Sequence, residues 1–165
     1  MPYELNTNIN VGEDQSENLS YLMPTSFKLT IDKLKYPNVE FSVQTTSIPD
    51  ISMDGATYAT PSRNLLIDGD KVNYADLAIT FVVDEELKNY SEIHDWILGM
   101  ATGKDSSNRD ITLHIMSSHN NVTKEIQFVD AYPTSLSGLP FDATISDSGY
   151  LIATTTFNYS YFKLL

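Results

Sequence analysis

Apolar and polar residues alternate along most of this chain, a pattern typical of β-strands with one buried face. The first such segment spans 26–31, where Phe27, Leu29 and Ile31 share one face. The alternation returns over 39–45, after a Tyr-Pro-Asn turn signal. Because a short polar turn separates the two segments, the sequence predicts that they pair as a β-hairpin.

The same pattern predicts further strands at 63–67, 75–83, 111–116, 122–132 and 151–162. Asp68-Gly69-Asp70 is predicted to be the tight turn between the first two of these, because Gly tolerates positive φ. Residues 52–61 are expected to form a loop of extended character. Turn signals recur about every ten residues, which favours an antiparallel sandwich or barrel.

One segment, 85–100, carries apolar residues at helical spacing instead. Asp84 is a suitable N-cap, and Gly99 or Gly103 could end the helix. The predicted fold class is therefore mainly β, an antiparallel β-sandwich or barrel with one flanking α-helix. Residues 23–165 are predicted to form this domain, and the polar residues 1–22 an N-terminal extension.

The net charge of −12, from 22 acidic and 10 basic residues, argues against a module that binds nucleic acid. An acidic surface repels phosphates, so it suits a conduit through which a polyanion slides without sticking. The simpler interpretation is that the charge only keeps the protein soluble. The chain has no cysteine, which excludes disulfides and thiolate chemistry.

The sequence offers no plausible catalytic or metal centre. A zinc site needs three or more converging ligands, and the spacing of His94, His114 and His119 does not supply them. Asp68-Gly69-Asp70 matches part of a calcium loop, but the further acidic ligands at fixed offsets are missing. We therefore expect no enzyme activity and no cofactor, and interpret the chain as a building block.

In their order and spacing, these segments resemble the tail tube proteins of contractile-tailed, T4-like phages. They resemble the tube proteins of type VI secretion systems more loosely. The resemblance covers roughly residues 24–163. Three segments in the first half carry it: an opening strand at 27–31, an Ile-Pro corner at 46–51, and a Gly-Asp turn with its returning strand at 66–81. Three more follow: an acidic helix start with a later Trp at 83–96, an aromatic-Pro-Thr corner at 124–134, and a Tyr-rich closing strand at 156–162.

The resemblance implies a fold and a function. Six subunits would form a ring in which four strands per subunit join a shared inner β-barrel, and rings would stack into the inner tube of a contractile tail. The protein would be assembled in the host cytoplasm and lie in the virion tail, with no membrane anchor. Its partners would be further copies of itself, the tail sheath protein, baseplate and tail terminator proteins, and DNA that passes through the lumen without specific binding.

Three sets of residues are candidates for assembly contacts. Glu125 and Gln127 alternate with apolar neighbours and are candidates for a lumen-facing row. The closing strand either lies centrally or forms an edge that pairs with a neighbouring subunit. The candidate edge residues are Thr155, Phe157, Tyr159 and Tyr161. The candidate ring-to-ring contacts are Met53, Tyr58, Arg63, Asp68, Gly69 and Asp70.

Two alternatives remain open at this stage. The first is a tube initiator of the same family, a single ring that joins the baseplate to the tube. The second is a sugar-binding β-sandwich, because 10 Tyr, 7 Phe and 1 Trp could supply exposed aromatic side chains. In the tail-tube interpretation, we expect the chain to complete its β-structure only by docking onto copies of itself around an axis.

Overall fold

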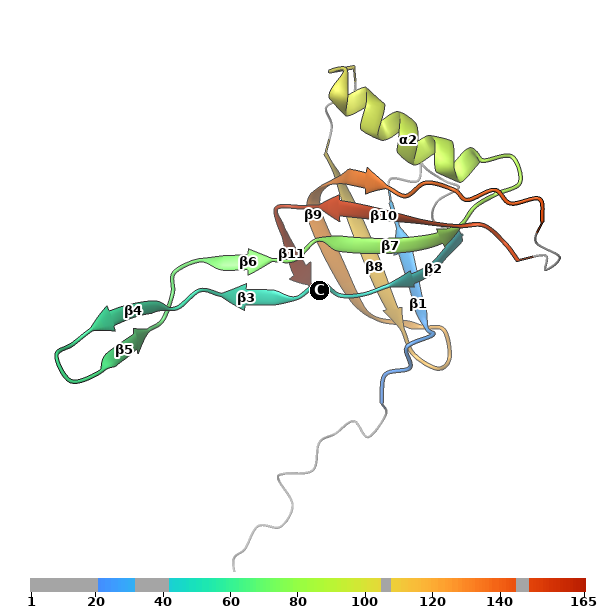
Figure 1. Cartoon of the computed structure of the whole chain (residues 1–165). Helices are drawn as coiled ribbons and strands as arrows, with labels where there is room; N and C mark the ends of the chain where they lie inside the picture. Colours follow the sequence, from blue (N-terminus) through green and yellow to red (C-terminus); the bar gives the residue numbers. More distant parts are fainter. Residues whose placement is uncertain (1–20, 32–41, 105–107, 145–148) are drawn as a thin grey trace, which may run out of the picture.

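The computed structural model describes residues 21–31, 42–104, 108–144 and 149–165, and it shows a β-sandwich with one helix and a projecting two-stranded ribbon (Figure 1). The mainly-β, antiparallel fold predicted from the sequence is thus confirmed. The helix is α2 (Lys88–Ala101). The strands are β1 (Phe27–Thr30), β2 (Val43–Thr46), β3 (Ile51–Met53), β4 (Ala56–Ala59), β5 (Asn64–Ile67), β6 (Val72–Tyr74), β7 (Leu77–Val82), β8 (Arg109–Met116), β9 (Val122–Leu136), β10 (Ile152–Asn158) and β11 (Tyr161–Leu164).

The sandwich consists of two antiparallel layers that share the long strand β9. The order β1-β8-β9-β10-β7-β2 forms one path, and β11 pairs with β9 beside it. The first half of β9 lies between β8 and β11, which gives the four-stranded layer β1-β8-β9-β11. The second half pairs with β10, which gives the layer β9-β10-β7-β2.

A β-bulge at Asp130 turns β9 from one layer into the other. Arg109 pairs with Ala131 but Ile111 pairs with Phe128, so β9 carries one more residue than β8 between these pairs. Asp130 has φ 56°, a left-handed conformation that Asp tolerates better than most residues. Its backbone N–H donates to Asp110 Oδ1 at 3.1 Å, which fixes the bend.

The core lies between the two layers, and α2 closes one side of it (Figure 1). Trp96 of α2 packs against Phe157 of β10, with ring centroids 5.8 Å apart. Burying one large apolar side chain contributes about 1.5–3 kcal/mol, so these contacts hold the helix on the sandwich. The buried apolar residues are Leu29, Ile31, Leu77, Ile79, Phe81, Ile93, Trp96, Ile111, Leu113, Ile126, Phe128, Ala131, Ala153, Phe157 and Tyr159.

Helix α2 begins three residues later than predicted, and Asp84 is not its N-cap. The helix starts after Leu87, which has φ 56° and makes no side-chain cap. The buried Asn89 explains the shift, because its amide accepts from the Asp84 N–H and donates to Val82 O at 2.7 Å. At the other end Gly103, with φ +69°, terminates the helix as one of the two predicted glycines. No helix in the described part of the chain is long and apolar enough to cross a membrane.

The predicted hairpin of 26–31 with 39–45 is wrong. β1 pairs with β8, and β2 pairs with β7, so the two strands lie in different layers. β1 keeps the predicted alternation, with Leu29 buried and Lys28 exposed, whereas residues 39–41 of the second segment lie outside the described residues. Alternation specifies only which face is buried and not which strand is the partner. The hairpin predicted between 111–116 and 122–132 is confirmed as β8 and β9, with Asn120 in a left-handed conformation at the turn.

The closing segment forms two strands instead of one, and its first part is central. β10 pairs with β7 on one side and with β9 on the other, so the backbone groups of Thr155 and Phe157 are already used within the chain. Tyr159 lies after β10 and is buried in the core. The edge interpretation is therefore wrong for these three residues. Tyr161 begins β11, which pairs with β9 alone among the described strands.

The segment Ile51–Tyr74, here called the arm, projects from the sandwich as a two-stranded ribbon (Figure 1). β3 pairs with β6 near the body and β4 pairs with β5 farther out. The reversal lies at the tip, where Thr60 N donates to Arg63 O at 3.0 Å. The predictions of a loop at 52–61 and of a turn at Asp68-Gly69-Asp70 are therefore wrong, and the latter residues interrupt the ribbon midway.

Candidate assembly surfaces

The arm exposes large apolar side chains that nothing in the described part of the chain covers. Every residue of β3, β4 and β5 is exposed, and Leu66 is 84% accessible. An isolated two-stranded ribbon is marginal in water, and an exposed apolar surface of this kind marks an interaction site. The exposed apolar residues of the arm are Ile51, Met53, Tyr58, Leu65, Leu66, Ile67 and Val72.

All six residues predicted to contact a neighbouring ring lie on the arm. Met53 and Tyr58 belong to its strands, Arg63 lies at its tip, and Asp68-Gly69-Asp70 lies at the interruption. Leu65-Leu66-Ile67 were predicted to belong to an ordinary strand and not to a contact surface. A signal was present, because consecutive apolar residues occupy both faces of a strand, and both faces then need cover.

The two halves of the arm approach each other closely at Gly69. A Cβ at this position would lie 1.4 Å from the backbone oxygen of Asp54, so only glycine fits. This reason differs from the predicted one, since the space, and not a positive φ, requires the glycine. Beside it, Asn73 Nδ2 donates to Asp54 Oδ2 at 2.8 Å and links the two halves.

Aromatic packing anchors the base of the arm to the sandwich. The Tyr74 ring lies 5.4 Å from the Phe162 ring and 6.1 Å from the Tyr159 ring, centroid to centroid. The Tyr159 hydroxyl donates to the backbone oxygen of Ala75 at 2.7 Å. Burial raises the pKa of the Tyr159 phenol to about 12, and the nearby Asp76 carboxylate and Tyr74 add to this effect. The arm therefore leaves the body at a fixed position.

The outer face of the β1-β8-β9-β11 layer is polar. Glu125 and Gln127 lie on it, half-buried, while Ile126 and Phe128, which alternate with them along β9, are buried in the core. His114 Nδ1 lies 3.1 Å from Glu125 Oε1 across the strand pair, and Gln127 Nε2 donates to Asp110 Oδ2 at 2.8 Å. The predicted common face of Glu125 and Gln127 is therefore present, and its position in a lumen stays a prediction.

Charges on this face are mixed and not predominantly acidic. Lys28 of β1 faces His114, and Lys163 of β11 faces Gln127, so basic side chains flank the row that carries Glu125 and Asp110. The net charge of −12 therefore arises mainly from other parts of the chain.

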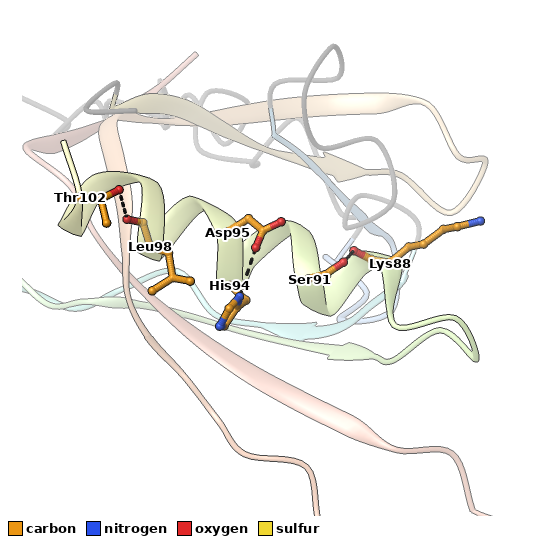
Figure 2. Close-up of polar contacts among 6 residues, drawn as sticks. All are labelled: Lys88, Ser91, His94, Asp95, Leu98 and Thr102. Atoms are coloured by element: carbon orange, nitrogen blue, oxygen red, sulfur yellow. Dashed lines mark hydrogen bonds and ion pairs between the residues drawn. The ribbon is translucent and has the colours of Figure 1, made fainter. Parts of the chain in front are cut away.

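The outer face of α2 makes polar contacts along its own length (Figure 2). His94 Nδ1 lies 3.2 Å from Asp95 Oδ1, and Thr102 Oγ1 donates to Leu98 O at 2.8 Å. His94, His114 and His119 lie on different elements, and the described residues contain no group of three His, Asp or Glu side chains placed to hold a metal ion.

A family model for the T4-like virus tail tube protein gp19 matches residues 23–163. The chain is 31% identical over 99 residues to the tail tube terminator protein of Enterobacteria phage T4. This match covers 55% of the chain and 56% of that protein, so the chain spans little more than half the length of this relative.

Solved structures of contractile injection systems have the same fold. The tube-terminating cap of the anti-feeding prophage matches with a TM-score of 0.70 at 16% identity, over 92% of this chain and 95% of that chain. The PVC sheath–tube complex in the extended state matches with a TM-score of 0.69 at 18% identity, over 88% and 91% of the two chains. The PVC sheath/tube terminator matches with a TM-score of 0.69 at 19% identity, over 90% and 99%.

At these identities the structural matches show a common fold, while the family model reaches from the start of the sandwich to its last strand. The chain belongs to the T4-like virus tail tube protein gp19 family.

Proposed function

We propose that this protein forms hexameric rings that stack into the inner tube of a contractile phage tail, with the arm as the ring-to-ring contact. As a member of a virus tail tube family, it is a structural protein of the virion tail. The observation that carries the proposal is the arm, an apolar ribbon outside a core that one chain completes by itself. Such a surface needs a partner that covers it. In a tube of identical subunits, the next ring supplies this partner for every ring in the stack.

The layer β1-β8-β9-β11 suits lateral closure of the ring. Its outermost strands, β1 and β11, each pair on one side only among the described strands. The four strands alternate in direction, so β11 of one subunit can join β1 of the next and continue the antiparallel order. Closing a sheet into a barrel in this way removes its unpaired edges.

In this ring, the polar face with Glu125 and Gln127 lines the lumen, and DNA passes along it. The mixed charge of this face, together with the net charge of −12, disfavours tight binding of a polyanion. The tail sheath protein, the baseplate and the tail terminator are the expected partners. We infer no catalytic role, because the proposed work is assembly and conduction.

Substitution of Leu66 tests this function. Leu66→Glu places a charge on the arm, and because the side chain is 84% exposed, the sandwich should fold as before. We expect rings without stacked tubes in negative-stain micrographs. Leu98→Glu, at a half-exposed position on the outer face of α2, is the matched control and should form tubes. Tubes of normal length from Leu66→Glu would exclude the arm as the stacking contact.

A second candidate is a terminator ring that ends the tube, favoured by the 31% identity to the T4 tail tube terminator protein. The fold serves both positions, so the number of copies per particle separates them. Quantitative mass spectrometry of purified virions, with the sheath protein as the reference, should give copy numbers near that of the sheath for a tube protein. A single ring per virion would identify a terminator, and the sequence-based alternative of an initiator would give the same count at the opposite end of the tail.

A further inference from the structure

A recess of about 590 Å³ lies at the end of β7 that is farthest from the arm. The residues that line it include the apolar Val82, Leu87, Phe141 and Tyr150, together with the acidic Asp84 and Glu85. Phe141 and Tyr150 are 76% and 83% exposed, although both are large and aromatic. Its size lies in the range of ordinary binding pockets, about 300–1,000 Å³.

We propose that this recess receives the tip of the arm from another copy of the chain. The inference rests on the proposed function, since it names the surface that the stacking arm contacts. The occupant is a second copy because this chain carries both an apolar projection and an apolar recess. The arm and the end of β7 at which the recess lies are on opposite sides of the body (Figure 1).

The topology places the two surfaces at opposite ends of one strand. The arm enters β7 at Leu77, and the recess begins at Val82 where β7 ends. An arm cannot reach its own recess in this geometry. A contact between two different surfaces of identical subunits is heterologous, and if it does not close it repeats without limit in one direction. A tube grows in this manner.

The two surfaces also complement each other in charge. The outer half of the arm has apolar side chains at Tyr58, Leu65 and Leu66, and Arg63 lies at the tip. The recess combines an apolar lining with the carboxylates of Asp84 and Glu85. In a chain with 10 basic and 22 acidic residues, a basic group at the end of the projection is unusual. Arg63 would pair with these carboxylates while Leu66 enters the recess.

Cysteine cross-linking tests the contact directly, because the chain contains no cysteine of its own. One variant carries Leu66→Cys and the other Phe141→Cys, and the two are mixed and treated with a short thiol-specific cross-linker. We expect a cross-linked dimer from this pair and none from the matched pair Leu66→Cys with Leu98→Cys, in which the second cysteine lies on the outer face of α2.

A charge exchange provides the second test. Arg63→Glu should abolish tubes in negative-stain micrographs, and combining it with Glu85→Arg should restore them. Lys104→Glu, which makes the same change of charge beyond the end of α2, serves as the control and should leave tubes intact.

The outcomes separate the two proposals. The variants could form tubes in which the cysteine of Leu66→Cys cross-links to the arm of another copy and never to the cysteine of Phe141→Cys. This result would overturn the recess assignment, but it would leave the stacking role of the arm standing. Failure of the unmodified protein to form rings or tubes would overturn both. The two cysteine variants could instead give no cross-linked product while the unmodified protein binds an oligosaccharide at Phe141 and Tyr150. This pair of results would overturn the proposal and assign the recess to a sugar.

Discussion

At the scale of single residues, the arm depends on Gly69 more than on its exposed apolar side chains. The two halves of the arm come close together here, and the Asp54 backbone oxygen occupies the space that a Cβ at position 69 would need. Gly55 lies on the other half of the arm at the same level. It has room for a side chain, because a Cβ there would lie 3.5 Å from Ile67 O, an ordinary contact distance. The two glycines therefore form a matched pair.

Gly69→Ala is expected to push the two halves of the arm apart, whereas Gly55→Ala should be tolerated. Because the arm lies outside the core, neither change should alter the free energy of unfolding by more than about 1 kcal/mol. Urea denaturation should show this, and electron microscopy should show tubes for Gly55→Ala alone. Equal assembly of the two variants would contradict the close approach at Gly69.

The raised pKa of Tyr159 leads us to expect that the folded protein loses stability at high pH. This pKa is raised to about 12, so the folded state keeps the phenol proton that the unfolded state loses near pH 10. The contribution of Tyr159 is therefore complete below pH 10 and declines as the pH rises towards 12. Tyr159→Phe should cost about 1 kcal/mol at neutral pH, through the lost bond to Ala75 O, and should flatten this decline.

Denaturant unfolding at pH 8 and pH 11 measures both effects. Tyr90→Phe is the control, since it removes another hydroxyl bond to the backbone, to Ser137 O at 3.0 Å. An identical alkaline loss of stability in Tyr159→Phe and in the unmodified protein would contradict the assignment.

At the scale of elements, β11 has an edge that no other described strand pairs, and its register shows which backbone groups point outward there. Glu125 and Leu165 exchange both backbone hydrogen bonds, at 3.4 and 2.8 Å. Hydrogen-bonded pairs alternate with non-hydrogen-bonded ones in an antiparallel ladder. Leu164, which pairs with Ile126, therefore directs its N–H away from β9 and towards the open edge.

Leu164→Pro should block ring closure without disturbing the fold. Proline removes an N–H that points away from β9, and edge strands tolerate proline. Native mass spectrometry should show monomers for Leu164→Pro and rings for Leu164→Ala. A ring of normal mass from the proline variant would exclude this edge as the lateral contact.

The sequence predicted most elements but few of the partners between them. Alternation located β1, β7, β8 and β9, because one face of each strand is buried and the period of two records it. It could not show that β1 pairs with β8, since pairing across long sequence distances leaves no local pattern. The boundary at residue 22 stays a prediction.

At the scale of the whole molecule, the chain is more complete than the sequence suggested. The core contains side chains from both layers and α2, and its bulkiest members, Trp96, Phe81, Phe128 and Phe157, are less than 2% exposed within one chain. The core therefore needs no contribution from neighbouring copies. That such copies complete the β-structure stays a prediction, and it concerns the edges at β1 and β11 and the arm, which no other described strand pairs or covers.

The bend in β9 has a mechanical consequence. In a sandwich of separate sheets, only side-chain contacts resist sliding of one sheet over the other. Here a continuous main chain crosses between the layers at Asp130, so covalent bonds oppose such shear. We expect a push applied to one layer to reach the other through the backbone as well as through side-chain contacts, which would be useful in the tube proposed above.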